Sequence, residues 1–344
     1  MNFASDNRGP AHPKILKALI EANAGFQKPY GTDDYTAAAT AKIRDIFEAP
    51  DAAVFLTPSG TATNALILAT LANPWDEIYC AYESHIRLDE CNAVEFFSGG
   101  ARITHVGDSD KLDPDALEAT MTAAAEHGVH GAQNGPVSIT QVTDLGSVYS
   151  LAEIKAITDV AKRHGSSVHL DGARFTNAMM SLGCSPADMT WKAGVDAVSF
   201  GGTKNGCLDV EAAIFFDPKY AHEFELRRKR GGHLFSKGRF LGAQMDAYLR
   251  EDLWRELAAS ANASGQRLFS ELRNRGATFW VEPAANLAFV DMPRHLHQKA
   301  HAAGAVYELM GPLEGPADEL VPSRFVCDWS IGEAGVSEFL SHLD

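Results

Sequence analysis

Short apolar runs and amphipathic stretches alternate along the chain through residue 216. A short apolar run is typical of a strand buried in a sheet, whereas apolar residues at helical spacing are typical of a helix packed against it. Strand candidates lie at 52–56, 77–80, 102–106, 137–142, 167–170, 198–200 and 212–216, and helix candidates at 12–24, 36–48, 61–71, 114–126 and 151–163. Because strands that alternate with helices favour βαβ units, we predict an α/β fold with a mostly parallel central sheet flanked by helices.

The pattern changes after about Pro218. Residues 220–230 are typical of a very polar helix and residues 240–260 of one long helix, and short strand candidates follow at 277–281 and 288–291. This mixture predicts a smaller α+β domain. We therefore expect an N-terminal arm (1–20), a large domain (21–239) and a small C-terminal α+β domain (240–344).

Composition and charge narrow the class of protein. A chain of 344 residues exceeds the size at which a single core usually stops growing, which favours two domains that share a cleft. The net charge of −15 repels nucleic acid and anionic membrane surfaces, and no apolar stretch is long enough to span a bilayer. Five dispersed cysteines without a CxxC pair argue against a disulfide framework and a zinc site. We expect a soluble cytoplasmic protein with no metal, no nucleic-acid partner and no membrane contact.

Two of the predicted strands lead into a charged residue. The run 167–170 is followed by Asp171, and the run 198–200 is followed by two glycines, Thr203 and Lys204. Ligands of open α/β sheets bind in the crevice at the carboxyl ends of the strands. Pyridoxal phosphate requires a Lys that forms a Schiff base and an Asp that keeps the pyridinium nitrogen protonated. A helix-capping Asp171 and a solvated Lys204 are the alternatives, and the presence of both residues in this order favours the cofactor site.

Further side chains fit the same crevice. Ser59, Gly60 and Thr61 join a strand to a helix, where free N–H groups favour an anion such as a phosphate; an ordinary helix N-cap is the alternative. His85 follows a strand and can stack on a cofactor ring or act as an acid or base; a hydrogen-bonded structural His is the alternative. The small residues before Lys204 leave room for a bulky ring.

Two arginines are candidates for binding a substrate carboxylate. Arg174 lies three residues after Asp171, and Arg324 precedes an apolar run in the predicted small domain. A guanidinium group can bind a carboxylate through two parallel hydrogen bonds. An ordinary ion pair is the alternative for each arginine. A basic run at 227–230 indicates either a solvated helix end or a positive patch near a cofactor phosphate.

Taken in order, these residues resemble the low-specificity L-threonine aldolases, which belong with the β-eliminating lyases among the fold-type I pyridoxal-phosphate enzymes. The resemblance runs nearly end to end and rests on Ser5-Asp6-Asn7, Tyr30 to Asp34, Ser59-Gly60-Thr61, His85, Asp171 to Arg174, Thr203-Lys204, Gly231-Gly232 and Arg324. It implies a fold-type I architecture with the arm at the active site and the cofactor in the large domain. A Rossmann dehydrogenase is excluded, because no Gly-x-Gly-x-x-Gly turn follows the first strand.

The resemblance also implies roles for these residues. Lys204 carries the cofactor, Asp171 pairs with the pyridinium nitrogen, and His85 stacks on the ring. Further cofactor contacts are expected from Ser59, Gly60, Thr61, Arg174 and Thr203, and substrate contacts from Ser5, Tyr30, Asp144, Arg174 and Arg324. Tyr30 is expected to come from a neighbouring subunit, because active sites in this family lie at a dimer interface. Members of the family are typically homotetramers.

The implied reaction is the retro-aldol cleavage of L-threonine, L-allo-threonine and related L-β-hydroxy amino acids to glycine and an aldehyde. An L-phenylserine-type aldolase and a β-eliminating lyase of the same fold are the alternatives. Asp144 stands where the family often has a His, and Asp89 stands where an aromatic residue is common. Both positions fall at the side-chain end of the substrate. The base for the β-hydroxyl therefore stays open between His85, Asp144 through a water, and the cofactor phosphate through a water.

Overall fold

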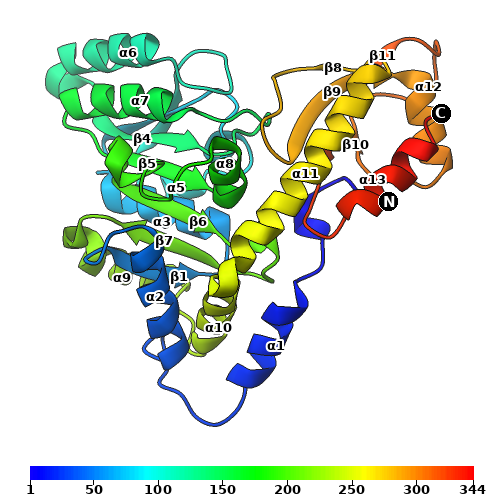
Figure 1. The fold of residues 1–344 in the computed structure, drawn as a ribbon. Coiled ribbons are helices and arrows are strands. Elements are labelled where there is room, and N and C mark those ends of the chain that lie inside the picture. The colour runs from blue at the N-terminus through cyan, green and yellow to red at the C-terminus, as the bar shows by residue number, and fades with distance from the viewer.

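The computed structural model describes residues 1–344, and a seven-stranded sheet forms the centre of the larger of two parts (Figure 1). Its strands are β1 (Ala53–Thr57), β2 (Asp76–Cys80), β3 (Arg102–His105), β4 (Gln133–Thr140), β5 (Val168–Gly172), β6 (Ala197–Gly201) and β7 (Glu211–Phe215). They lie in the order β1-β7-β6-β5-β4-β2-β3. All neighbouring strands are parallel except β7, which is antiparallel to β1 and β6. The predicted α/β fold with a mostly parallel sheet is confirmed.

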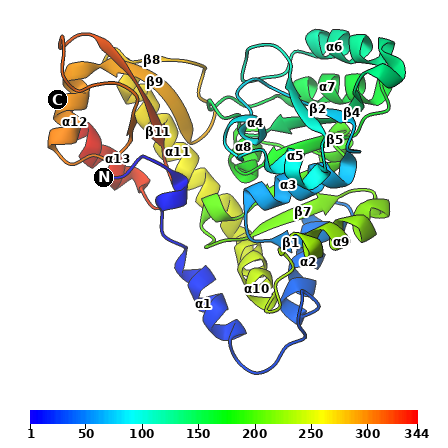
Figure 2. The same cartoon turned by 180° about the vertical axis from the view of Figure 1, so that it is seen from behind.

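Helices cover both faces of this sheet (Figure 1, Figure 2). They are α2 (Asp34–Ile46), α3 (Gly60–Leu71), α4 (His85–Leu88), α5 (Ala93–Ser98), α6 (Pro114–Glu126), α7 (Leu151–Arg163), α8 (Phe175–Leu182), α9 (Ala221–Arg230) and α10 (Arg239–Tyr248), and α1 (Pro13–Ala22) packs against α10. Successive residues of a strand point to opposite faces. Val198 and Ile214 therefore join a core shared with α2, α7 and α8, whereas Ala197 and Phe215 pack with α3 and α9. Burial on both faces explains why these strands are nearly continuous apolar runs.

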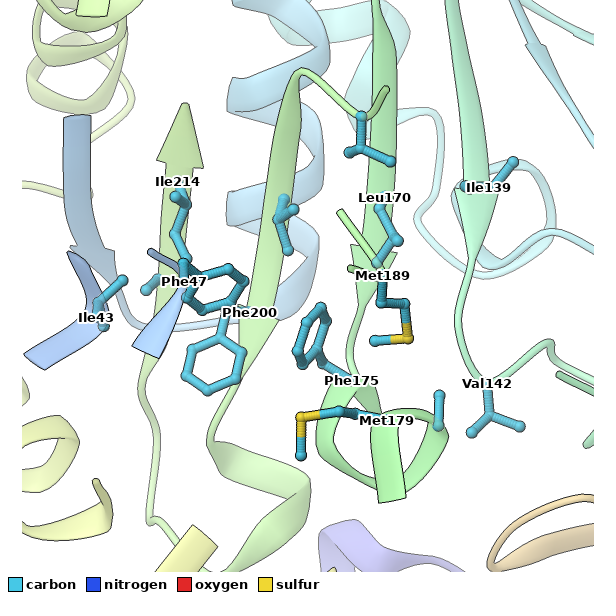
Figure 3. Packing of buried hydrophobic residues seen from close by; sticks show 14 of the residues in the cluster. Ile43, Phe47, Ile139, Val142, Leu170, Phe175, Met179, Met189, Phe200 and Ile214 are labelled. Carbon is cyan, nitrogen blue, oxygen red and sulfur yellow. The ribbon is translucent and has the colours of Figure 1, made fainter. Parts of the chain in front are cut away.

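Aromatic rings pack in the core between the sheet and helices α2 and α8. Figure 3 shows Phe47, Phe175 and Phe200 close together among aliphatic side chains. The centroid of the Phe175 ring lies 5.4 Å from that of Phe47 and 5.3 Å from that of Phe200. Such tilted and edge-on contacts are favourable for aromatic pairs. Because Phe200 lies on β6, this cluster fixes the strand that leads into Lys204.

A four-stranded antiparallel sheet organises the C-terminal part, in the order β10-β11-β9-β8. Its strands are β8 (Thr278–Phe279), β9 (Leu287–Pro293), β10 (Glu308–Leu309) and β11 (Leu320–Val326), and its helices are α11 (Leu253–Asn274), α12 (Arg294–Ala302) and α13 (Gly332–Ser341). The core of this part is separate from that of the large sheet, and it includes Phe3 from the N-terminal arm. Both chain termini lie at this part of the molecule (Figure 2).

The single helix expected over 240–260 is wrong. Helix α10 ends at Tyr248 and α11 begins at Leu253. Between them, Glu251 and Asp252 have φ angles of 53° and 56°, in the left-handed region that a continuous right-handed helix does not contain. No glycine or proline marks this break, so the apolar pattern continues across it.

Helix α11 runs from one part of the molecule to the other (Figure 1). Leu253 and Leu257 belong to the core of the large sheet, whereas Leu268 and Leu272 belong to the core of the small sheet. The predicted domain boundary at residue 240 stays a prediction. Neither α11 nor any other helix is long and apolar enough to cross a membrane.

Candidate active site

A cleft of about 280 Å³ opens where β5 and β6 end, beside the first turn of α3. It is lined by Asn7, Ser59, Gly60, Thr61, Asn64, His85, Glu90, Asp171, Ala173, Thr203, Lys204, Asp209 and Glu211. The predicted catalytic residues Lys204, His85 and Asp171 all lie in this wall, together with Ser59, Gly60, Thr61 and Thr203. Among the other predicted site residues, the wall does not include Ser5, Tyr30, Asp144, Arg174 or Arg324. No group of three or more His, Cys, Asp or Glu side chains is arranged to hold a metal ion.

Asp171 is buried on β5, and its two carboxylate oxygens accept from different donors. Oδ1 accepts from the Ala173 N–H at 3.0 Å, and Oδ2 accepts from Asn64 Nδ2 at 2.8 Å. The hydroxyl of Ser199 donates to Oδ1 of Asn64 at 2.7 Å and lies 2.9 Å from His169 Nε2. Burial lowers the pKa of His169 to about 4, so this imidazole is neutral near pH 7. Asn64, Ser199 and His169, which support Asp171 from behind, thus carry no charge near pH 7.

Lys204 lies half-buried in a short turn after β6, and its amine makes no hydrogen bond or ion pair within the chain. The turn is held by neighbours instead. The Val210 N–H donates to the Thr203 hydroxyl at 3.1 Å, and the Gly202 N–H donates to Glu211 Oε2 at 3.2 Å. Burial raises the pKa of Glu211 to about 7, against the lowering effects of the Thr203 hydrogen bond and the Lys204 charge. These contacts fix the backbone of the turn that carries Lys204. They leave its amine free to bind a ligand.

His85 begins the short helix α4 and sits between two carboxyl groups. Its Nδ1 lies 3.0 Å from Glu90 Oε1, and its backbone N–H donates to Asp144 Oδ2 at 3.0 Å. Burial alone would lower the pKa of His85, but the hydrogen bond that its imidazole donates to Glu90 and the charges of Asp171 and Asp144 raise it. Burial also raises the pKa of Asp144 to about 6, although the His85 charge opposes this. Asp144 therefore contacts His85 through its backbone, whereas Glu90 is the carboxyl group in contact with the imidazole.

The first turn of α3 presents free backbone donors to the cleft. Ser59 is the N-cap, and its Oγ accepts from the Ala62 N–H at 3.3 Å. The N–H groups of Gly60 and Thr61 make no hydrogen bond within the chain. A Cβ atom on Gly60 would have no atom within 4 Å, so the space beside it is open. A helix N-terminus with unpaired N–H groups that face an open cleft is suited to bind a phosphate. Ser59 also caps the helix, so both the phosphate site and the ordinary N-cap are compatible with this turn.

The two predicted carboxylate-binding arginines are held by the N-terminal arm. Arg174 precedes α8, and its Nε and Nη2 donate to the carboxylate of Asp6 at 2.7 and 3.0 Å. Arg324 lies on β11, where its Nη2 donates to the Ala4 carbonyl at 3.0 Å and pairs with Glu308 at 2.9 Å. Each arginine therefore forms an ion pair, as in the alternative considered for it.

Ser5 and Tyr30 lie outside the cleft wall. The Oγ of Ser5 accepts from the Asn7 N–H at 3.1 Å, and Ser5 lines a separate hollow that Asp328 shares. Asn7, two residues on, reaches the cleft itself. Tyr30 is exposed and lines a different cavity, with the Lys229 amine 4.5 Å from its ring centroid. Within a single chain, Tyr30 does not contribute to this cleft.

Sequence reasoning missed Asn64, Glu90 and Glu211, which line the cleft, and the partner role of Asp6. All four are polar residues that are nearly inaccessible to solvent. Asn64 stands within the apolar helix candidate 61–71, and Glu211 directly precedes an apolar strand candidate. For Asn64 and Glu211 the available signal was a polar residue in or beside an apolar run, because such residues are buried only when they have partners. Asp6 and Glu90 stand next to other polar residues and carry no such signal.

The fold, with its strand-end aspartate and lysine in one cleft, is that of the fold-type I pyridoxal-phosphate enzymes. The beta-eliminating lyase family matches residues 2–295. The chain is 38% identical to a low specificity L-threonine aldolase from Pseudomonas sp., over 99% of this chain and 96% of that protein. It is 39% identical to a low specificity L-threonine aldolase from Pseudomonas aeruginosa, over 95% and 92% of the two chains. The chain belongs to the beta-eliminating lyase family and, within it, to the low-specificity L-threonine aldolases.

Solved structures agree with this assignment. A threonine aldolase from Leishmania major superposes with a TM-score of 0.91 at 26% identity, over 99% of this chain and 98% of that one. A serine palmitoyltransferase from Sphingomonas wittichii superposes with a TM-score of 0.73 at 17% identity, over 100% of this chain and 86% of that one. The second similarity concerns the fold alone.

Proposed function

We propose that this chain catalyses the pyridoxal-phosphate-dependent retro-aldol cleavage of L-threonine, L-allo-threonine and related L-β-hydroxy amino acids, releasing glycine and an aldehyde. The observation that carries the proposal is the placement of Asp171 and Lys204 in one cleft of a threonine aldolase fold. No feature of the cleft favours the L-phenylserine-type aldolase or the β-eliminating lyase that the sequence left as alternatives.

The residues present fit the cofactor. Bound pyridoxal phosphate supplies an electron sink for the bond that is broken. The unpartnered amine of Lys204 is suited to hold it covalently, and the buried carboxylate of Asp171 to hold a proton at its ring nitrogen. The free N–H groups of Gly60 and Thr61 are suited to its phosphate. Ser59, His85, Thr203 and Arg174 complete the proposed set of cofactor contacts.

His85 is the best-supported base for the β-hydroxyl, because it lines the cleft whereas Asp144 does not. Glu90 orients the imidazole through Nδ1, which leaves Nε2 as its second proton-transfer atom. Asp144 then supports His85. Its carboxylate accepts a hydrogen bond from the His85 backbone N–H, and its charge raises the pKa of the imidazole.

We propose that Arg174, Arg324 and Ser5 receive the substrate carboxylate, and that Tyr30 serves the site of a neighbouring subunit. The exposed position of Tyr30, outside the cleft of its own chain, is compatible with such an exchange. We therefore propose a dimer in which each subunit contributes residues to the partner's active site. Two such dimers would form a cytoplasmic homotetramer, as is typical of the family.

A product assay tests the function. The cofactor-loaded enzyme is incubated with L-threonine, L-allo-threonine and L-phenylserine, with D-threonine as the substrate expected to fail. We expect glycine and acetaldehyde from both threonine isomers, with no keto acid. Ammonia and a keto acid in place of glycine would identify a β-eliminating lyase instead, and cleavage of L-phenylserine alone would identify the phenylserine-type enzyme.

A further inference from the structure

The N-terminal arm connects the two parts of the molecule before the first helix begins. The Phe3 N–H donates to the Val306 carbonyl at 2.7 Å, and the Val326 N–H donates to the Phe3 carbonyl at 2.8 Å. The ring of Phe3 is buried in the core of the small sheet, 5.0 Å from the ring of Phe339. The arm is therefore anchored on the small sheet at its third residue.

Three residues later the same arm reaches the large sheet. The side chain of Asp6 is fully buried and accepts from Nε of Arg174 at 2.7 Å and from Nη2 at 3.0 Å. Asn286, from the small part, also donates to Asp6 Oδ2 at 3.3 Å. Two parallel hydrogen bonds between a carboxylate and a guanidinium group fix the plane of that group as well as its distance.

The arm contacts the second arginine through its backbone. Nη2 of Arg324 donates to the Ala4 carbonyl, two residues before Asp6, at 3.0 Å. Ser5, the third proposed carboxylate ligand, lies between these two contacts. A segment of three residues therefore touches the side chains of both arginines, of which Arg174 precedes α8 and Arg324 lies on β11, 150 positions apart in the chain.

The charge on Asp6 is maintained in spite of its burial. Burial alone would raise the pKa of Asp6, but the charges of Arg174 and Lys204 and the hydrogen bonds from Arg174 and Asn286 hold it below its usual value. The contact uses Nε and Nη2 of Arg174, whereas Nη1 makes no hydrogen bond within the chain and is not fully buried. A guanidinium group carries five N–H donors, so Asp6 leaves donors of Arg174 free for a ligand.

We propose that the N-terminal arm is a positioning element for the substrate carboxylate: Asp6 and the Ala4 carbonyl hold the guanidinium groups of Arg174 and Arg324 in one fixed arrangement. Asp6 is a positioning residue, because it acts through Arg174. This inference rests on the proposed function, since it takes an amino acid carboxylate as the ligand of the two arginines.

The test is Asp6→Asn in the cofactor-loaded enzyme. An amide oxygen can accept only part of the hydrogen bonding from the Arg174 fork, and its NH₂ group opposes a second donor. We expect the dissociation constant of glycine, followed by the change in the visible absorbance of the cofactor, to rise by about tenfold or more, which corresponds to about 1.4 kcal/mol. The KM for L-threonine rises with it, while kcat changes little.

A ligand without a carboxylate separates positioning from general damage. 1-Amino-2-propanol is threonine without its carboxylate, so its affinity is expected to be the same in the wild type and in Asp6→Asn. Asp344→Asn is the matched control, because Asp344 forms a surface pair with Arg275 at 2.6 Å, outside the cleft. We expect no change in glycine affinity for that variant.

A second, smaller change probes the anchor of the arm. Phe3→Leu reduces the buried side chain that packs against Phe339 without touching either arginine, and we expect it to weaken glycine binding selectively as well. Unchanged or tighter glycine binding in Asp6→Asn overturns the inference. Asp6 would then either have no effect on carboxylate binding or compete with the substrate carboxylate for Arg174. Equal loss of glycine and 1-amino-2-propanol also overturns it. Failure of the wild type to bind glycine at all would count against the proposed function itself.

Discussion

Asn64 connects two groups of the cleft that lie far apart in the chain. Its Nδ2 donates to Asp171 at 2.8 Å and to Glu90 at 2.9 Å, and its Oδ1 accepts from Ser199 at 2.7 Å. Glu90 in turn contacts His85. One amide thus fixes both the carboxylate proposed for the pyridinium nitrogen and the group that orients the imidazole. Glu90 Oε2 is buried without a hydrogen-bond partner, and the bonds among the other atoms of this network make each member a specific target for substitution.

Glu90→Gln tests the charge state of His85. Because the Glu90 carboxylate favours the protonated imidazole, its removal lowers the pKa of His85. We expect the limb of the pH profile of kcat/KM that reports His85 to move toward lower pH. Asp89→Asn is the neighbouring control, since Asp89 is exposed. An unmoved limb in Glu90→Gln, or an equal shift in the control, would contradict the pairing.

His85 and Asp144 are distinguished by paired substitutions. We expect His85→Asn to lower kcat on L-threonine by on the order of a hundredfold or more, as the loss of a general base does. Asp144→Asn retains an acceptor for the His85 N–H and loses only the charge, so its kcat is expected to fall less. The measurement is steady-state kinetics with the cofactor absorbance recorded for both variants. A larger loss in Asp144→Asn would transfer the role of base to Asp144.

At the scale of elements, helix boundaries with local signals agree with the expectation. The helix expected over 114–126 is observed at those residues, with Pro114 in its first turn and Asp113 capping it. The helix expected over 151–163 is also observed there, with a capping box between Ser150 and Glu153. Interactions within a few residues decide these boundaries. The break after α10 has no such signal, because left-handed Glu251 is tolerated only through packing of the helices on either side.

Ser59→Ala tests whether the start of α3 serves a ligand as well as the helix. Loss of an N-cap hydroxyl costs about 1 kcal/mol of stability. Ser150→Ala removes the equivalent cap from α7, which takes no part in the cleft. We expect similar losses of thermal stability in both variants, and weaker pyridoxal-phosphate binding in Ser59→Ala alone, measured by equilibrium dialysis. Equal cofactor affinity in the two variants would show that Ser59 caps the helix and does not contribute to cofactor binding.

At the scale of the whole molecule, the site is assembled from parts that no single element contains. The cleft combines strand ends of the large sheet, the N-terminus of α3 and Asn7 of the arm. The arm is anchored on the small sheet, so the positions of both parts affect the surroundings of the cleft. Tyr30, in contrast, lines a separate cavity of its own chain. An assembly with shared sites would give this residue a function.

Complementation between two inactive variants tests the shared site. Lys204→Ala removes the proposed attachment of the cofactor, and Tyr30→Ala removes the proposed partner contribution. A hybrid dimer contains one site with Lys204 intact and an intact Tyr30 from the other subunit. We therefore expect co-expressed, doubly tagged hybrids to recover L-threonine cleavage that neither variant shows alone. Hybrids that stay inactive would place Tyr30 in the site of its own chain or outside the site.

The large sheet, the crevice at its edge and the pair Asp171 and Lys204 could be predicted from the residues alone. These follow from local pattern, because apolar strands must be buried and the carboxyl ends of parallel strands meet at one edge. The folded chain was needed to show that Asn64 and Glu90 join the cleft, and that Asp6 pairs with Arg174 across 168 positions of the chain. The reason is physical: the energy of a polar contact depends on burial and on a partner's exact placement, and neither is encoded in the spacing of residues along the chain.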